Sequence, residues 1–189
     1  MHLQLGRLLL LALYRLAPQG IYGKTAGAIA PGRVLLDVGG ASGRLAESIG
    51  GRYELSLVLD VDAAHFPRRR PAGVEFICAS ACYLPLRRES VDSAVFHDSL
   101  HHMDDPEKAI QEATEALRVN GKLYVFDFDR CGLAGRAILL FEKALGFPAR
   151  LMTAEELERL ISGLRVLSVR RGALSTLTLV AVKPSRGTP

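Results

Sequence analysis

The chain of 189 residues contains no tryptophan and only three cysteines. Cys78, Cys82 and Cys131 form an odd set without a Cys-x-x-Cys pair, so the sequence indicates neither a disulfide framework nor a cysteine-ligated zinc site. Free thiols of this kind are typical of proteins in a reducing compartment, and we therefore expect a cytoplasmic protein.

Long hydrophobic runs are absent as well. A transmembrane helix needs about 20 consecutive apolar residues, whereas the N-terminal apolar run covers residues 8–13 and is followed by Tyr14 and Arg15. No small-x-small cleavage site follows this run, so a signal peptide is not indicated. We expect a packed N-terminal helix and no transmembrane segment; a helix that makes peripheral contact with a membrane is the alternative.

Neither sign of charge dominates the composition. The 24 lysines and arginines exceed the 20 aspartates and glutamates by a net charge of +4. The basic residues are scattered apart from Arg68, Arg69 and Arg70, and a nucleic-acid surface requires basic residues clustered on one face. We therefore do not expect nucleic acid as a partner.

Short apolar runs alternate with polar or helical segments between residues 33 and 129. The runs are rich in Val, Leu, Ile and Phe and show little polar alternation, which is typical of parallel strands buried on both faces. The predicted strands cover residues 34–38, 55–59, 74–79, 93–96 and 123–128, and the predicted helices between them cover residues 43–49 and 107–117, the second ended by a turn at Asn120-Gly121.

The pattern changes after residue 130. Two helices are predicted at residues 133–145 and 154–161, and Thr153 and Glu156 complete a capping box at the start of the second. Strands at residues 165–171 and 173–182 follow as an antiparallel pair. The predicted fold class is α/β: a Rossmann-like, doubly wound, mostly parallel seven-stranded sheet with a C-terminal antiparallel hairpin. We expect a single domain over residues 1–183, with an N-terminal helical cap (1–30), a helical segment over the cleft (130–163) and a flexible tail (184–189).

A glycine-rich segment follows the first predicted strand. Glycines allow the backbone to turn tightly and to approach a ligand closely, and the next helix presents free N–H groups at its start. A dinucleotide-binding loop requires G-x-G-x-x-G, whereas residues 39–43 read Gly-Gly-Ala-Ser-Gly, with Asp37 two residues before. This spacing disfavours a nicotinamide enzyme; an ordinary strand-to-helix turn is the non-functional alternative.

The second predicted strand ends at Asp60. A carboxylate at the tip of that strand can accept hydrogen bonds from both hydroxyls of a ribose, each worth about 1.5–3 kcal/mol. Asp62 stands directly before the next helical residues and is the better helix cap. Asp60 is therefore available to a ligand.

These segments together resemble the core of a class I methyltransferase that depends on S-adenosylmethionine (SAM). The resemblance is to the type 11 group, which includes methyltransferases of ubiquinone and menaquinone biosynthesis. It is carried, in order along the chain, by residues 34–44, 59–62, 76–86, 91–106 and 116–123.

The resemblance implies a set of cofactor-binding residues. Asp37 and the backbone of Gly39, Gly40, Ala41 and Gly43 would hold the amino acid end of SAM. Asp60 would bind the ribose, Val61 would pack against the adenine, and Ser80 and Ala81 would hydrogen-bond the adenine ring. Ala41 replaces a glycine of the family pattern and Ser80 replaces an aspartate, so we expect weakened SAM binding.

The loop after the fourth strand is expected to lie beside the sulfonium. His97 and His101 are the candidate catalytic residues, because imidazole titrates near neutral pH and can accept a proton from an acceptor hydroxyl, thiol or ammonium. His97 is also a candidate cofactor contact; the alternative is that these histidines only brace the loop. Carboxylates of Asp98, Asp127 and Asp129 are expected nearby, but such groups are more often solvated, and the sequence predicts no metal site.

The function expected from the resemblance is transfer of a methyl group from SAM to a small hydrophobic or amphipathic molecule. Apolar segments at the N-terminus and after residue 130 suggest the character of the acceptor. Two alternatives stay open: a methyltransferase that acts on RNA or protein, and a catalytically silent SAM-binding module that acts through a partner.

Overall fold

The structure is a computed structural model that describes residues 19–146 and 149–185. Most of the predicted N-terminal cap (1–30) lies outside the described residues, as do residues 186–189 of the predicted tail.

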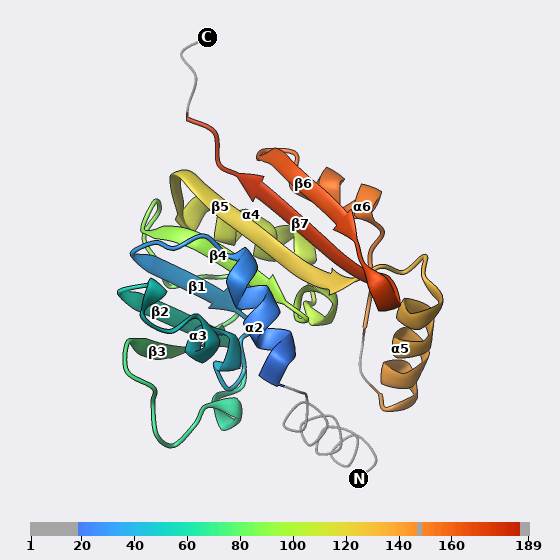
Figure 1. The fold of residues 1–189 in the computed structure, drawn as a ribbon, viewed down its shortest axis with the longest axis horizontal. Helices are drawn as coiled ribbons and strands as arrows, with labels where there is room; N and C mark the ends of the chain where they lie inside the picture. The colour runs from blue at the N-terminus through green and yellow to red at the C-terminus, as the bar shows by residue number, and fades with distance from the viewer. Residues whose placement is uncertain (1–18, 147–148, 186–189) are drawn as a thin grey trace.

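One sheet organises the described part of the chain (Figure 1). Its strands follow the order β3-β2-β1-β4-β5-β7-β6; β1 to β5 are parallel, and β7 is antiparallel to both β5 and β6. This arrangement confirms the predicted doubly wound sheet and its C-terminal antiparallel hairpin. The strands are β1 (Val34–Val38), β2 (Leu55–Asp60), β3 (Val74–Cys78), β4 (Val91–His97), β5 (Leu117–Phe128), β6 (Arg165–Arg171) and β7 (Thr176–Val182).

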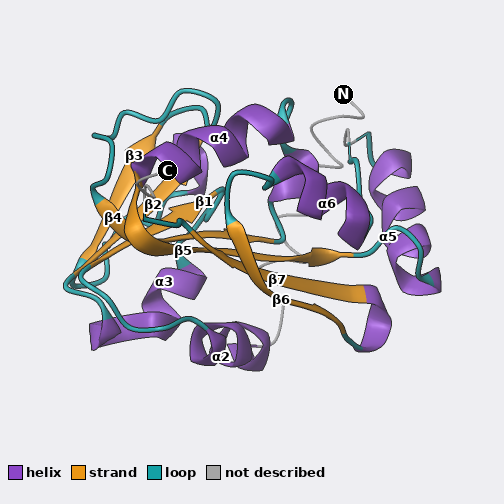
Figure 2. Cartoon of the chain, turned by 90° about the horizontal axis from the view of Figure 1, so that it is seen from above, coloured by secondary structure: helices purple, strands orange, loops and turns teal. Residues whose placement is uncertain are grey.

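Helices cover both faces of the sheet, as Figure 2 shows. On one face, α2 (Gln19–Ala28) and α3 (Arg44–Ile49) pack on β1 and β4 around the buried side chains of Ile29 and Leu35. On the other face, α4 (Pro106–Ala116) and α6 (Ala154–Leu160) enclose the larger core. Helix α5 (Leu133–Ala144) follows the carboxyl end of β5.

The sequence explains the helix boundaries locally. Asp105 caps α4 through the Lys108 amide, and Pro106 occupies the first turn, where its missing N–H costs nothing. At α6 the predicted capping box is present, because Thr153 and Glu156 each accept a hydrogen bond from the other's amide.

One connection differs from the prediction. Asn120 and Gly121 lie inside β5, which begins at Leu117, instead of forming a turn before it. The register between β4 and β5 shifts there, since Val91 pairs with Leu117 but Ser93 pairs with Lys122. The extra residues of β5 form a bulge, in which Asn120 adopts a φ of 64°.

The topology also locates the edge where a ligand belongs. Strand order reverses between β1 and β4, because β1 pairs with β2 on one side and with β4 on the other. The connections that follow β1 and β4 therefore leave toward opposite faces of the sheet. In such sheets ligands bind outside the carboxyl ends of the strands at this reversal.

Candidate functional site

The loop between β1 and α3 is held in a left-handed conformation at alternate residues. The backbone φ is 73° at Gly39, 46° at Ala41 and 75° at Gly43. Two of these positions carry glycine, for which the conformation is unstrained. Ala41 adopts it at a cost of about 1–3 kcal/mol, so the substitution seen in the sequence introduces backbone strain.

The amide groups of this loop are already used within the protein. The loop therefore has few N–H groups left for an anion, unlike the phosphate-binding loop of a dinucleotide enzyme. The hydrogen bonds run from Gly39 N and Gly40 N to Leu59 O (2.7 and 3.2 Å), from Ala41 N to Asp60 Oδ2 (3.1 Å) and from Gly43 N to Gly40 O (2.8 Å).

Asp37 lies directly beneath the loop. A Cβ atom at Gly40 would stand 2.6 Å from the Asp37 carboxylate carbon, so only glycine lets the loop pass over this side chain. The residue is 1% exposed, and neither carboxylate oxygen has a hydrogen-bond partner among the described residues. Burial, aided by the charge of Asp60, raises the pKa of Asp37 to about 7. A buried acceptor in this state indicates a donor that binds from outside.

Asp60 is placed at the tip of β2 as predicted. Its Oδ1 accepts hydrogen bonds from the Asp62 amide (2.9 Å) and faces Nδ1 of His65 (3.2 Å). Burial opposes ionisation, but the contacts with His65 and with the Asp62 and Ala41 amides lower the pKa of Asp60. Asp62 caps the following short helix through the Ala64 amide, as expected.

The residues predicted to contact adenine lie along the same edge. Val61 follows β2 and is 75% exposed, which is unusual for a valine beside a buried strand. Ala81 is buried after β3, and the neighbouring Ser80 hydroxyl accepts a hydrogen bond from the Cys82 amide at 3.2 Å. The apolar surface of Val61 is thus available to a flat ring.

His97 ends β4 and packs under α2. Its ring lies 5.3 Å from that of Tyr22 and 6.0 Å from that of Phe126, between ring centroids, and Nε2 stands 3.2 Å from the Thr25 hydroxyl. Burial lowers the pKa of His97 to about 4, more strongly than the Asp127 charge raises it. The imidazole is therefore neutral across the physiological pH range.

His101 has a different environment. Its Nδ1 lies 2.6 Å from Asp127 Oδ1, and its Nε2 lies 3.6 Å from Glu142 Oε1. Burial opposes protonation, but the charge and hydrogen bond of Asp127, together with the nearby Glu142 carboxylate, raise the pKa of His101 to about 10. Because both ring nitrogens face carboxylates, His101 ties the β4 loop to the end of β5 and to α5.

Comparison with known proteins gives the family to which this edge corresponds. Residues 36–125 match the family model described as a methyltransferase domain. The match covers just under half of the chain, and this part of the chain is similar to that family. The resemblance predicted from the sequence is therefore confirmed.

Individual methyltransferases show the extent of the similarity. An O-methyltransferase of Penicillium expansum is 28% identical over 151 residues, which cover 74% of this chain and 55% of that protein. A demethylmenaquinone methyltransferase of Renibacterium salmoninarum is 29% identical over 100 residues, which cover 52% of this chain and 42% of that protein. The chain thus spans about half the length of the curated relatives that it matches.

A solved methyltransferase extends the likeness to the fold. The SAM-dependent methyltransferase of Thermotoga maritima superposes with a TM-score of 0.71 at 22% identity, covering 86% of this chain and 87% of that one. This comparison supports the same doubly wound architecture, including the antiparallel strands after β5.

The carboxyl edge of the sheet does not include every residue that the sequence predicted there. Asp129 turns away from it, since its carboxylate pairs with Arg171 at 2.6 Å. Conversely, sequence reasoning missed Glu142, a buried carboxylate on α5. The apolar pattern of α5 hid Glu142; a single acid in an apolar helix was the available signal.

Two further features lie away from the carboxyl edge of the sheet or concern the described chain in general. A hollow lined by Arg88, Glu115, Lys183 and their neighbours lies at the opposite, amino edge of β4 and β5, where Lys183 donates to main-chain carbonyls. Within residues 19–146 and 149–185, no helix has the length and apolar character to cross a bilayer.

Proposed function

We propose that this protein transfers a methyl group from SAM to a small hydrophobic or amphipathic acceptor. The observation that carries the proposal is the buried carboxylate of Asp37 beneath a loop whose amide donors are already used. This combination favours a ligand with a positively charged donor and disfavours one with phosphates.

SAM fits these requirements. Its α-ammonium group would donate to Asp37 and to loop carbonyls, and its ribose hydroxyls would donate to Asp60 at the tip of β2. Val61 would cover one face of the adenine, and Ser80 and Ala81 would contact the ring edge. A nicotinamide dinucleotide would instead bring its negative pyrophosphate toward the Asp37 carboxylate.

When bound, SAM supplies a methyl carbon activated by a positively charged sulfur. The contribution of the protein is then to hold donor and acceptor in line and to exclude water. His97 suits this role, because a neutral ring among Tyr22, Thr25 and Phe126 can orient a ligand without adding charge. His97 is therefore the candidate for contact with the acceptor. His101 is less suited than His97 to act as a base, because both of its ring nitrogens face carboxylates.

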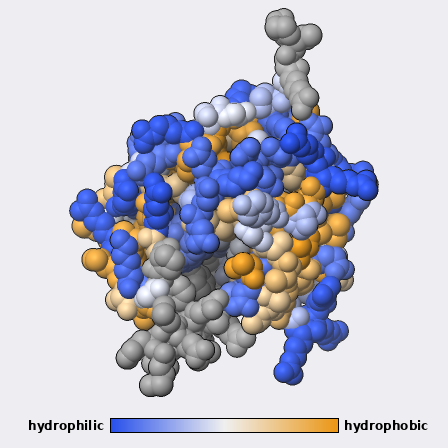
Figure 3. Space-filling view, turned by 180° about the vertical axis from the view of Figure 1, so that it is seen from behind, coloured by the Kyte–Doolittle hydropathy of each residue, from blue (hydrophilic) through white to orange (hydrophobic). Residues whose placement is uncertain are grey.

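The surface near α5 supports a hydrophobic acceptor. Leu140 and Phe141 are exposed on this helix while Glu142 turns inward. Figure 3 shows that the back of the molecule carries hydrophobic areas interspersed among hydrophilic ones. O-methyltransferase relatives are compatible with a hydroxyl acceptor.

The cofactor assignment is tested by thermal melting with S-adenosylhomocysteine (SAH) or NAD. A ligand at a hundred times its dissociation constant stabilises the fold by about 2.7 kcal/mol, which raises the midpoint by roughly 5–10 °C at this size. We expect this shift with SAH and none with NAD. The reverse result would contradict the proposal.

A variant of Asp60 tests the placement of the ribose. Asp60→Asn keeps the shape of the side chain and removes its charge, and we expect SAH affinity measured by calorimetry to fall at least tenfold. Asp104→Asn, an exposed surface change, is the matched control. Unchanged SAH affinity in the Asp60 variant would mean that the ribose lies elsewhere.

The two alternative functions predict different results. Binding to bulk RNA with a steep salt dependence would favour a nucleic-acid substrate. SAH binding without turnover on a broad panel of hydroxyl, amine and thiol acceptors would favour a silent SAM-binding module, for which the strained Ala41 is the supporting observation.

A further inference from the structure

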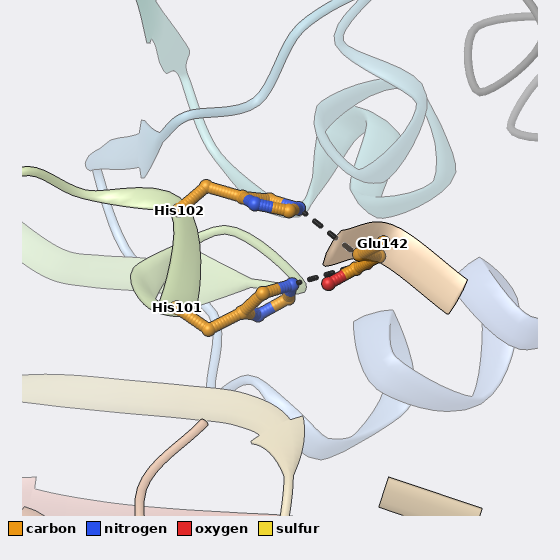
Figure 4. A group of neighbouring side chains, drawn as sticks. All are labelled: His101, His102 and Glu142. Atoms are coloured by element: carbon orange, nitrogen blue, oxygen red, sulfur yellow. Dashed lines mark ion pairs between the residues drawn. The ribbon is translucent and has the colours of Figure 1, made fainter. Parts of the chain in front are cut away.

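Three side chains from two distant segments converge beside the carboxyl end of β4. His101 and His102 lie on a short 3-10 helix (Leu100–His102), and Glu142 points toward both from α5 (Figure 4). The Nε2 atoms of both histidines lie 3.6 Å from the same oxygen, Glu142 Oε1. One potential ligand atom from each residue lies within 4.8 Å of the other two.

These separations are too long for hydrogen bonds. They are close to the spacing between two ligands of one metal ion, which is about 3.3 Å for tetrahedral bonds of about 2.0–2.1 Å. The side chains of His101 and Glu142 are 0% and 4% exposed, whereas that of His102 is 26% exposed. Two ligands are therefore held rigidly by the protein, and the third lies on the route from solvent.

Asp127 completes the arrangement from behind His101. A metal-binding histidine usually donates its other ring N–H to a carboxylate, which fixes the tautomer and aims the ligand nitrogen. The 2.6 Å contact between His101 Nδ1 and Asp127 Oδ1 is of this kind and directs Nε2 toward Glu142.

A second group, Asp98, His101 and Asp127, also brings potential ligands together. Its 2.6 Å contact between His101 and Asp127 is shorter than the separation of about 2.9 Å that two ligands at right angles on one ion require. The distances therefore favour the group with Glu142.

We propose that His101, His102 and Glu142 bind a divalent transition metal ion of the zinc type. Two imidazoles and one carboxylate are ligands for such ions and disfavour Mg²⁺ and Ca²⁺, which prefer oxygen. The charge of the ion balances the buried carboxylates of Glu142 and Asp127, and its remaining positions are open to water or to a substrate oxygen. The sequence predicted no metal site, because only Asp98, Asp127 and Asp129 were considered as ligands and such carboxylates are more often solvated. Glu142 was not considered, since it is remote from the histidines along the chain.

The site gives the acceptor a chemical class. If the proposed methyl transfer is correct, an ion held here would bind an acceptor hydroxyl and lower its pKa, so that its proton would pass to solvent water. The oxygen would then form a bond to the methyl carbon as the carbon–sulfur bond of SAM breaks, with SAH as the leaving group. This part rests on the proposed function; metal binding itself does not.

Metal binding is tested on protein without an affinity tag, stripped with EDTA and titrated with Co²⁺ as a spectroscopic substitute for Zn²⁺. We expect saturation at one equivalent, visible d–d absorption bands, and no near-ultraviolet band of thiolate ligation. His102→Asn and Glu142→Gln should each weaken Co²⁺ binding at least tenfold, and Asp127→Asn should weaken it by about 10–100-fold. Glu158→Gln, an exposed change on α6, is the matched control.

SAH-induced thermal shifts of the same proteins keep the outcomes separate. His102 is partly exposed, so we expect its asparagine variant to fold and to retain the SAH shift. Co²⁺ binding that does not saturate in the wild type, or that is unchanged in both the His102 and Glu142 variants, would overturn the metal site. Saturable Co²⁺ binding without any SAH shift would overturn the proposed function alone.

Discussion

The side chains at the carboxyl edge of the sheet differ sharply in protonation although they lie close together. Burial dominates at Asp37 and His97 and favours their neutral forms, whereas carboxylate neighbours favour the charged form of His101 as long as no metal ion is bound. Such opposed environments are typical of functional sites, where individual side chains are held in the state that binding requires. The effect of such an environment on the stability of the protein is clearest at Asp37.

Asp37 is expected to destabilise the free protein at neutral and alkaline pH. Its folded-state pKa of about 7 exceeds the ordinary value of 3.8, so its contribution to stability is present below pH 4 and is lost as the pH rises through 7. Relative to Asp37→Asn, the wild type should lose about 1–3 kcal/mol of unfolding free energy between pH 4.5 and 8. Urea denaturation at both pH values measures this difference.

The same variant should lose SAH binding, which separates a functional carboxylate from a merely tolerated one. Asp104→Asn, on the surface, should show no difference from the wild type at either pH. An Asp37 variant that binds SAH normally, or a pH dependence identical to that of the wild type, would contradict the role assigned to this residue.

At the scale of elements, the loops depart from regular geometry where the site is built. The β1–α3 loop places Ala41 at positive φ, and the turn after β4 places Asp98 at a φ of 53°. The helices and strands behind them follow their sequence signals closely, as the capping box of α6 does. Rigid elements therefore carry the strained connections.

Ala41→Gly is expected to stabilise the loop that contains it. Removing a Cβ from a backbone at φ 46° relieves about 1–2 kcal/mol of strain. The greater conformational freedom of glycine in the unfolded chain reduces this gain in stability by about 0.5–1 kcal/mol. Chemical denaturation should show a net gain of about 0.5–1 kcal/mol, and calorimetry should show SAH affinity equal to or above that of the wild type.

The control for Ala41 is the same substitution in a regular helix. Ala137→Gly lies at an exposed position in the middle of α5 and should destabilise the protein by about 1 kcal/mol. If both changes destabilise equally, the conformation assigned to Ala41 is wrong.

The whole molecule is a sheet with separate hydrophobic layers on its two faces. Ile29 belongs to the layer under α2 and α3, and Leu157 belongs to the layer under α6, and both are almost fully buried. The layers share the central strands, so neither can persist when the sheet is lost. The described part of the chain should therefore unfold as one unit.

Ile29→Ala and Leu157→Ala test this unity. Each should cost about 2–5 kcal/mol, and the double variant should show the sum to within about 0.5 kcal/mol because the residues lie on opposite faces. Circular dichroism should show a single transition in every variant. Leu133→Ala, on an exposed leucine, should change stability by less than about 0.5 kcal/mol; two separate transitions would contradict a shared core.

The sequence by itself determined the order of strands and helices and the edge that carries the chemistry. Apolar runs such as β1 are recognisable because they are buried on both faces. Acidic residues such as Asp37 and Asp60 are recognisable because they stand near the carboxyl ends of those strands. The bulge of β5 was not predictable from Asn120-Gly121, because the same dipeptide serves in a turn and in a bulge.

Only the tertiary structure decided which charges meet. Whether Asp37 is solvated or buried depends on the passage of Gly40 above it, and the conformation of Ala41 depends on hydrogen bonding to Asp60. Glu142 reaches His101 because α5 lies beside the segment that follows β4, a contact between segments remote along the chain. The local sequence pattern indicates which residues are buried and with what periodicity. Which polar side chains pair depends on the packing of segments that are distant along the chain.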